Sequence, residues 1–249
     1  MAEPLPLKSL ASLLAQIPTC TAIDVLMKEH PVESFILQGV SGIQFAEKPI
    51  AGPARTLRYL PARADLAQSV APLLNFKLLD SVQPGEVLVF DTARGLGGSV
   101  LGDMLALRAV RRGAAAVVTD GAVRDLAGLA TTGLPVFASR IFPMPFRGSL
   151  VPHEIDAPVQ CGGALVMPGD MILADRDCVL ALPPALAALV VERAGSYLHE
   201  ETFSRELLDR GEALSCAYPI PDSLRTLYTR YLDHGELPTA EQVAGAHGR

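Results

Sequence analysis

Basic residues are scarce in this 249-residue chain. The 21 Lys and Arg are outnumbered by 27 Asp and Glu, so the formal net charge is −6. A protein that binds nucleic acid needs a basic patch or stripe to meet the phosphates. The charge balance therefore argues against RNA or DNA as a ligand.

Long apolar runs are also missing. No stretch reaches the roughly 20 apolar residues that a bilayer-spanning helix needs. Residues 1–18 do not show the basic segment followed by a long apolar one that marks a secretory leader. We therefore expect a cytoplasmic protein that has no membrane partner.

The four cysteines, Cys20, Cys161, Cys178 and Cys216, lie far apart in the chain. This spacing lacks the close pairs of a zinc site and the density of a disulfide scaffold. Strand-like apolar sequence flanks Cys161 and Cys178, so we expect both thiols to be buried.

Several common catalytic motifs are absent. The five histidines have no zinc-binding spacing, and no G-x-S-x-G nucleophile elbow occurs. A glycine-rich run at residues 94–105 has neither the G-x-G-x-x-G of a dinucleotide site nor the Lys-Ser/Thr of a phosphate loop. These absences do not identify a function, but they argue against a histidine zinc site, a G-x-S-x-G hydrolase, a dinucleotide site and a phosphate loop.

What the chain does contain is apolar sequence in a globular proportion, with 49% hydrophobic and 19% charged residues. One domain with appendages at its ends is the simplest organisation. Residues 7–29 are predicted to be helical and broken at Pro18, with Thr19 or Thr21 capping the second part.

Short valine-rich segments bounded by Gly, Pro or Asp predict buried strands at 52–60, 86–92, 114–120 and 134–139. Helical periodicity between them predicts helices at 63–79 and 101–110, the second ending before Gly113. Strands that alternate with helices indicate an α/β core with substantial parallel pairing.

The second half changes character. Residues 157–183 predict several short strands joined by Gly and Asp turns, with no helix between them. Residues 184–210 predict a long helix that stops at Gly211. A further helix is predicted around 223–234, and the last ten or so residues have a composition typical of disorder.

The glycine-rich run at 94–105 is a first candidate site. Glycines allow the backbone to approach a ligand, and free N–H groups at a helix start favour an anion. A flexible connection with close helix packing explains the same residues equally well, so both interpretations stay open here.

A second candidate is the run Asp120-Gly-Ala-Val-Arg124-Asp125, just beyond a predicted strand. Ligands bind at the carboxyl ends of strands in open α/β sheets. However, Asp120-Gly121 is ordinary turn chemistry, and Asp125 could cap a helix over residues 126–130. On the residues alone, the structural interpretation is favoured slightly for Asp125 and strongly for Asp120.

Three further acids, Asp170, Asp175 and Asp177, lie within eight positions and invite a metal hypothesis. The sequences P-G-D and D-x-D between strands are usually tight turns, and the spacing of an EF-hand does not follow. We therefore expect these three acids to have a structural role.

Two long segments carry a resemblance to a known family. Residues 102–138, GDMLALRAVRRGAAAVVTDGAVRDLAGLATTGLPVFA, and residues 157–183, APVQCGGALVMPGDMILADRDCVLALP, resemble the family that joins 4-hydroxy-4-methyl-2-oxoglutarate aldolases with the RraA regulators of ribonuclease E. The resemblance covers roughly residues 15–211, and its G-[DE]-x-L turn paired with D-G-x-x-R-D is fairly specific.

The resemblance implies a three-layer β/β/α swivelling-domain fold with N- and C-terminal helical extensions, assembled as trimers or hexamers with active sites between subunits. The family domain would occupy residues 1–211, and residues 212–249 would form a C-terminal extension. This tail is longer than that of the compact ribonuclease regulators, which favours the enzyme branch of the family.

The resemblance also implies roles for individual residues. Asp125 would ligate a divalent metal, Mg²⁺ or Mn²⁺, and Arg124 would contact the oxo oxygen of the substrate. The backbone amides of the turn formed by Gly102, Asp103, Met104 and Leu105 would hold the substrate carboxylate.

Asp103 would bond water on the metal. A glutamate of a neighbouring subunit would also reach this water shell. Glu200 and Glu201 are the candidates, and Glu201 is preferred because Arg205 and Gly211 follow it in a similar pattern.

These roles predict a metal-dependent lyase that cleaves a 4-hydroxy-2-oxo acid to pyruvate and a second oxo compound, and that also decarboxylates oxaloacetate. An imine mechanism is disfavoured, because none of the four lysines, Lys8, Lys28, Lys48 and Lys77, lies on a predicted strand or in the glycine-rich run. A non-catalytic protein that binds a ribonuclease is the main alternative, and a metal-dependent hydratase is a third. The sequence leaves the natural 2-oxo acid open.

Overall fold

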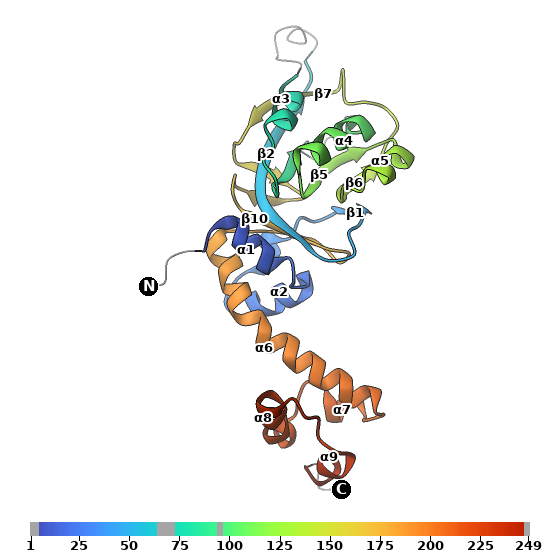
Figure 1. Cartoon of the computed structure of the whole chain (residues 1–249). Coiled ribbons are helices and arrows are strands. Elements are labelled where there is room, and N and C mark those ends of the chain that lie inside the picture. Colours follow the sequence, from blue (N-terminus) through green and yellow to red (C-terminus); the bar gives the residue numbers. More distant parts are fainter. Residues whose placement is uncertain (1–4, 64–72, 94–96, 247–249) are drawn as a thin grey trace. The chain divides into compact units, whose positions relative to one another are not determined.

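The computed structural model describes residues 5–63, 73–93 and 97–246. The chain forms two compact units, which divide between Val191 and Glu192. Figure 1 shows the order of the elements along the chain. Each unit is described separately below.

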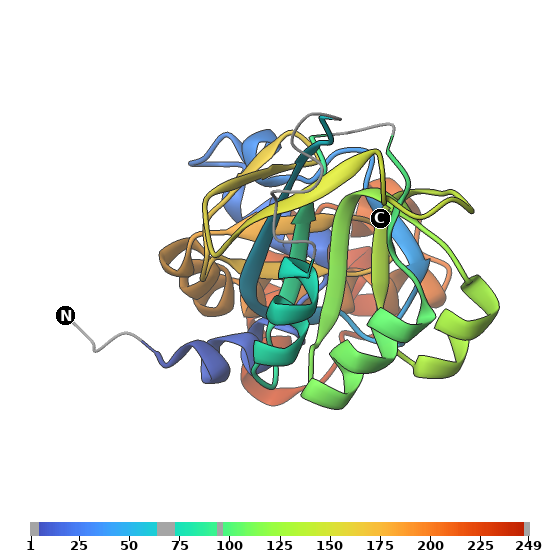
Figure 2. The ribbon, with the colours of Figure 1, turned by 90° about the horizontal axis from the view of Figure 1, so that it is seen from above.

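Parallel strands form the middle of the first unit. β5 (Ala116–Val123) lies between β3 (Val87–Asp91) and β6 (Val136–Ile141), and β2 (Ile50–Pro61) pairs with β3 in parallel. Every residue of β3 and β5 is buried, as expected for parallel strands that are covered on both faces. The predicted α/β core with parallel pairing is confirmed (Figure 2).

Antiparallel strands extend this core into a mixed sheet that has nine strands within the described residues. The long strand β2 makes this possible, because it also pairs with β10 and β7. The other strands of this sheet are β1 (Ser41–Gln44), β4 (Ser99–Leu101), β7 (Leu150–Ile155), β10 (Met171–Ala174) and β11 (Val179–Leu182). A separate two-stranded sheet consists of β8 (Val159–Cys161) and β9 (Ala164–Val166). The strand-rich second half predicted from the sequence is confirmed.

Alternate residues of β3 point into two different hydrophobic cores. Leu88 and Phe90 face the core that also holds buried residues of α3 (Leu74–Ser81), α4 (Asp103–Arg112) and α5 (Leu126–Thr132). Val87 and Val89 face the core built with strands β8 to β11. Because side chains alternate along a strand, helices cover one face of the parallel strands and further strands cover the other.

The helix boundaries agree with the glycine signals. α4 ends at Gly113, which is left-handed with φ +85°, as glycine permits. The helix predicted over residues 63–79 is seen as α3 from Leu74, and positions 64–72 of that prediction lie outside the described residues. Residues 94–96 of the glycine-rich run also lie outside them.

The N-terminal helices are α1 (Leu7–Leu14) and α2 (Thr19–Leu26), followed by the 3-10 turn η1 (Val32–Phe35). The predicted break at Pro18 is confirmed, but the predicted threonine cap is wrong. Pro18 occupies the cap position, and Asp175 accepts hydrogen bonds from the Thr19 amide (2.8 Å) and hydroxyl (2.7 Å). A carboxylate 156 positions away therefore satisfies the helix start.

Among the described helices, none is by itself long and apolar enough to cross a membrane. In the part of the chain that the structure describes, one bent pair, α1 and α2 with 106° between them, meets that criterion by length and composition.

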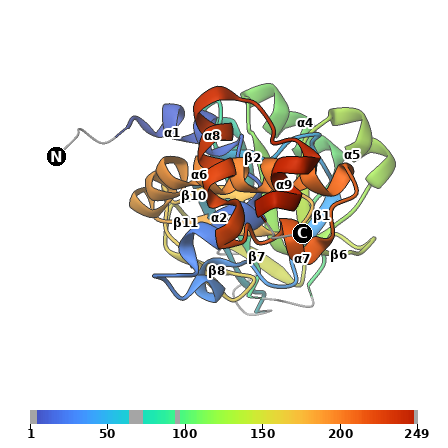
Figure 3. The same ribbon diagram turned by 90° about the horizontal axis from the view of Figure 1, so that it is seen from below.

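Helix α6 (Pro184–Asp209) ends just before Gly211, as predicted. The second unit begins within this helix and continues through α7 (Leu214–Ala217), η2 (Asp222–Leu224), α8 (Arg225–His234) and α9 (Ala240–Ala246), which Figure 3 shows from below. The domain boundary predicted after residue 211 stays a prediction, and the compact units divide earlier, inside α6.

Aromatic packing holds this unit together. Phe203 is fully buried and packs edge-on against Tyr228, with ring centroids 5.3 Å apart. Val243 of α9 is buried in the same cluster. The expectation that the last ten residues lack structure is therefore wrong for residues 240–246, because one valine gives α9 an apolar anchor.

Candidate active site

Asp125 has an unusual backbone conformation. It lies between β5 and α5 with φ 58° and ψ 45°, in the left-handed region that residues other than glycine rarely adopt. Its carbonyl accepts the amide of Leu129 (2.8 Å), but within the described chain its side chain makes no capping hydrogen bond to α5. The interpretation of Asp125 as a side-chain helix cap is therefore wrong, and its carboxylate is available for another role.

That carboxylate turns toward its neighbour in the chain. Asp125 Oδ2 lies 3.2 Å from Arg124 Nε, and the two side chains are 42% and 38% exposed. The Arg124 amide donates to the carbonyl of Leu101 (3.0 Å), which fixes the backbone of the pair against β4. Ion pairs this exposed contribute about 0.2–1 kcal/mol, so a ligand could rearrange this one at small cost.

The start of α4 supplies donors beside this pair. Gly102 is the cap residue, and the side chain of Asp103 accepts the amide of Met104 (2.7 Å). The first amides of a helix cannot reach an intrahelical carbonyl, and the positive end of the helix dipole lies there. This helix start suits a carboxylate ligand.

Two glycines bring these parts together. A Cβ at Gly102 would lie 2.6 Å from Asp125 Oδ2, and a Cβ at Gly128 would lie 2.6 Å from both Cβ and Oδ2 of Asp103. Real Cβ atoms do not approach other atoms so closely. Glycine at these two positions lets the Asp125 carboxylate lie beside the turn before α4 and lets α5 pack closely on the side chain of Asp103.

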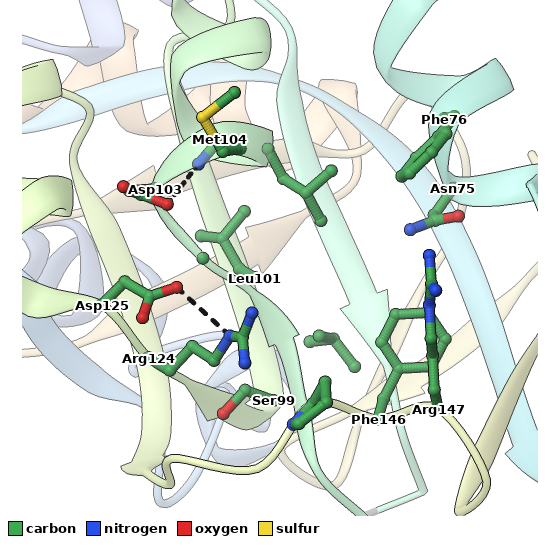
Figure 4. A pocket seen from close by; sticks show the side chains of 14 residues that line it. Asn75, Phe76, Ser99, Leu101, Asp103, Met104, Arg124, Asp125, Phe146 and Arg147 are labelled. Carbon is green, nitrogen blue, oxygen red and sulfur yellow. Dashed lines mark hydrogen bonds and ion pairs between the residues drawn. The ribbon is translucent and has the colours of Figure 1, made fainter.

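The result is a cavity of about 290 Å³. Six of the seven site residues that the family resemblance implied line it, all except Glu201: Gly102, Asp103, Met104, Leu105, Arg124 and Asp125. Figure 4 shows Asp103, Asp125 and Arg124 grouped on one side of this cavity. Its volume suits a ligand of a few carbon atoms.

The remaining lining residues include three of the glycine-rich run, Ser99, Val100 and Leu101, and five that were not singled out in the sequence: Asn75, Phe76, Pro145, Phe146 and Arg147. They come from α3, from β4 and from the loop after β6. No motif marks the five residues outside this run, because each lies apart in sequence from the Arg-Asp pair and only the fold brings them to it.

The predicted glutamates lie elsewhere in the chain. Glu200 and Glu201 are on α6 in the second unit, and Glu200 is paired with Arg225 (3.0 Å). The contribution of Glu201 from a neighbouring subunit stays a prediction.

Asp120 has a structural role, although not in the turn that the sequence suggested. It lies inside β5, is 5% exposed, and accepts hydrogen bonds from the amide (2.8 Å) and hydroxyl (2.9 Å) of Thr92. The neighbouring buried carboxyl of Asp91 accepts amides of Ala93 and Gln160. Burial raises the pKa of Asp91, and the charge of Asp120 raises it further.

The structural interpretation of the third acidic set is confirmed for two of its members. Asp170 accepts the amide of Met167 (2.8 Å), and Asp175 accepts the amide of Asp177 (2.9 Å). The buried thiol predicted for Cys161 is confirmed, whereas Cys178 is only partly buried.

The lining residues fit a hard divalent cation. In the part of the chain that the structure describes, no group of three His, Cys, Asp or Glu side chains is arranged around one point. Magnesium needs less, because it keeps several waters and is held by one or two carboxylates plus substrate oxygens. Asp125 and Asp103 offer such oxygens, and the missing side chain of Gly102 leaves space at Asp125 Oδ2.

Comparison with known proteins then identifies the family. The family model described as RraA-like, Aldolase/RraA, matches residues 19–181. The chain belongs to the RraA-like family. The resemblance noted in the sequence is therefore confirmed.

Individual relatives agree with this assignment. A Thermus thermophilus protein provisionally named 4-hydroxy-4-methyl-2-oxoglutarate aldolase is 36% identical over 134 residues, which are 53% of this chain and 75% of that protein. Protein DlpA of Legionella pneumophila is 28% identical over 181 residues, which are 70% of this chain but only 28% of DlpA. The chain thus spans less than a third of that relative.

Solved structures show the same fold. Streptomyces coelicolor RraAS2, described as an unusual member of the RNase ES inhibitor RraA family, superposes with a TM-score of 0.71 at 30% identity, covering 82% of this chain and 99% of that one. An uncharacterized Pseudomonas syringae protein gives a TM-score of 0.74 at 24% identity, covering 87% and 98%. The mixed α/β fold is therefore that of RraA-like proteins.

Proposed function

We propose that this RraA-like chain is a divalent-metal-dependent lyase that cleaves a 4-hydroxy-2-oxo acid to pyruvate and a second oxo compound. Oxaloacetate decarboxylation is proposed as a second reaction of the same site. The observation that carries the proposal is the Arg124–Asp125 pair, 3.2 Å apart, in one cavity with the start of α4. Family relatives provisionally named as aldolases of this kind support it.

Breaking the bond beyond C3 of a 2-oxo acid leaves negative charge on the 2-oxo oxygen. Mg²⁺ or Mn²⁺ held by Asp125, with Asp103 acting through water, would supply a Lewis acid at that oxygen. The Arg124 guanidinium would add a fixed positive charge at the same place, the preorganised kind of stabilisation that is often the largest catalytic contribution.

The substrate carboxylate would bind at the backbone amides of the turn 102–105 at the start of α4, where it would replace Asp103 Oδ1 as the acceptor of the Met104 amide. The cavity wall beyond them is apolar, with Val100, Leu101 and Phe146. These apolar side chains would contact the carbon atoms of the bound substrate. None of the four lysines, all within the described residues, lines this cavity, which agrees with a mechanism that does not use an imine.

The alternative is a binding protein that regulates a ribonuclease, and the similarity to RraAS2 favours it. A binding surface of that kind has no need for a cavity that places an arginine, two carboxylates and a helix start together. We therefore rank the lyase first. A trimer or hexamer and a cytoplasmic location remain part of this proposal.

The test is an assay of pyruvate release from several 4-hydroxy-2-oxo acids and from oxaloacetate. Activity is expected with Mg²⁺ or Mn²⁺, and EDTA should abolish it reversibly. Undiminished turnover in EDTA, combined with borohydride trapping of substrate on a lysine, would exclude the mechanism. Absence of turnover on every compound with metal present would give the binding-protein alternative first place.

A further inference from the structure

Arg147 is a second cationic side chain of the cavity, and the proposed mechanism does not use it. It lies in the loop between β6 and β7 and lines the cavity together with Phe146. Arg124 is paired with Asp125 at 3.2 Å, whereas Arg147 makes neither an ion pair nor a hydrogen bond within the described chain. The cavity therefore contains one guanidinium group that no carboxylate of the described residues neutralises.

The position of Arg147 relates it to the far end of a bound substrate. Figure 4 shows Asp103, Arg124 and Asp125 on one side of the cavity and Arg147 on the other. In the proposed mechanism, the 2-oxo group and the C1 carboxylate bind on the side of the Arg-Asp pair. The atoms beyond the C3–C4 bond, which is the bond that breaks, then extend toward Arg147.

We infer that Arg147 binds the second carboxylate of a dicarboxylic substrate and thereby sets the balance between the two proposed reactions. This inference rests on the proposed function. A guanidinium group stays charged at neutral pH and can donate two parallel hydrogen bonds to one carboxylate. The Arg147 side chain is long and exposed. It can therefore meet a carboxylate attached to C3, as in oxaloacetate, or to C4, as in 4-hydroxy-2-oxoglutarate.

In aldol cleavage the second carboxylate is a spectator. When the C3–C4 bond of 4-hydroxy-2-oxoglutarate breaks, the C4 hydroxyl loses its proton and C4 becomes the aldehyde carbon of glyoxylate. The electron pair passes to the enolate, which takes up a proton at C3 to give pyruvate. The C5 carboxylate keeps its charge throughout. Arg147 therefore binds the substrate and the transition state equally, which lowers KM and leaves kcat unchanged.

In the decarboxylation of oxaloacetate the second carboxylate is itself the leaving group. The C3–C4 bond breaks, C4 leaves as neutral CO₂, and the electron pair passes to the same enolate, which is protonated at C3. A guanidinium group that holds the C4 carboxylate stabilises the substrate more than the transition state, because the charge leaves that carboxylate during the reaction. This contact therefore lowers kcat for decarboxylation. Arg147 thus favours aldol cleavage over decarboxylation.

Calorimetry with two inert ligands tests the contact itself. 2-Oxoglutarate and 2-oxopentanoate share a five-carbon 2-oxo acid chain and differ in having a carboxylate or a methyl group at the far end. Neither has a C4 hydroxyl or a carboxylate on C3, so neither is cleaved. With Mg²⁺ present, the wild-type protein is expected to bind 2-oxoglutarate about tenfold more tightly. Equal affinities would overturn the inference even where aldol substrates release pyruvate, and binding of neither ligand would overturn it together with the proposed function.

Variants assign this preference to Arg147. Arg147→Met removes the charge, so the preference for 2-oxoglutarate should disappear while the affinity for 2-oxopentanoate stays the same. Arg111→Met is the matched control, because Arg111 is an exposed arginine of α4 that does not line the cavity. This control removes the same charge from the protein and should keep the preference. Loss of the preference in both variants, or in neither, would contradict a specific role for Arg147.

Turnover assays separate a substrate contact from a structural role. In Arg147→Met, KM for 4-hydroxy-2-oxoglutarate should rise about tenfold with kcat unchanged. The kcat for oxaloacetate should instead rise by up to about tenfold, because the stabilisation of its leaving carboxylate is lost. Arg147→Lys keeps the charge without the planar fork and should give values between those of Arg147→Met and the wild type. A fall in kcat for both reactions would overturn the inference, since a damaged fold gives that result.

Discussion

Gly102 and Asp125 are in contact across two turns of the chain: a Cβ on Gly102 would lie 2.6 Å from the carboxylate oxygen Oδ2 of Asp125. The nearest other atoms to that Cβ belong to Arg124, at 3.5 and 3.6 Å. The bare backbone of Gly102 thus forms one side of the space around the Arg-Asp pair. Its φ is −134°, so the requirement for glycine here comes from space and not from backbone conformation.

Gly102→Ala is therefore expected to damage the site more than the fold. The Asp125 carboxylate is the end of a side chain and can turn away, so the melting temperature should change little, while pyruvate release should fall at least about tenfold. Gly195→Ala is the control, because a Cβ there meets nothing within 4 Å. Full activity in Gly102→Ala would show that the space at Oδ2 is not used.

Asp125→Asn tests the carboxylate alone. Asparagine tolerates the left-handed backbone as well as aspartate does, and the exposed ion pair with Arg124 contributes little stability. The melting temperature should stay within a few degrees, while turnover falls by orders of magnitude. Parallel thermal unfolding and pyruvate assays decide this, and a stable variant with normal turnover would remove Asp125 from the chemistry.

Arg124→Lys keeps a positive charge but loses the planar fork of donors. The backbone hydrogen bond from residue 124 to Leu101 does not depend on the side chain, so the fold should persist. We expect kcat to fall more than the affinity for pyruvate as a product inhibitor, because the charge on the oxo oxygen is greatest in the transition state. Equal losses in kcat and in pyruvate affinity would indicate a role in binding alone.

Asp91 predicts a pH effect on stability. Burial raises the pKa of Asp91 above its ordinary value of 3.8, so the folded state holds the proton more tightly than the unfolded state. The contribution of Asp91 to stability is then greatest below that value and is lost as pH rises through the raised pKa. Asp91→Asn removes this loss, so its stability relative to wild type should improve from about pH 4 upward. Urea denaturation at several pH values measures the difference, and a relative stability that falls with pH would have the wrong sign.

The fold could be predicted where local sequence decides the structure. Strands β3 and β5 have continuous valine-rich runs because both their faces are buried, and the ends of α4 and α6 are marked by Gly113 and Gly211. The group that accepts the first amide of α2 could not be predicted, because it is Asp175, 156 positions away. Interactions across such distances leave no mark on the local sequence.

The residues of the candidate site likewise divide into those that the sequence could predict and those that it could not. Arg124 and Asp125 are adjacent in a recognisable motif, so the sequence could place them at the end of a strand. Asn75 is an ordinary polar residue near the start of a short helix, and its burial against the cavity follows only from the packing of α3. Asp120 shows the opposite case, because a dipeptide typical of turns lies inside a buried strand.

The close fit between Gly128 and Asp103 has a consequence for how activity would be lost on heating. Gly128 belongs to α5, a helix of seven residues, and its contact positions the side chain at the start of α4. Short helices at the edge of a core open by local fluctuations well below the free energy of global unfolding. When α5 opens, Asp103 loses this contact and Asp125 loses the amide of Leu129, while the buried strands stay intact. Activity should therefore disappear at a lower temperature than the sheet, with amide exchange at Leu129 reporting the opening.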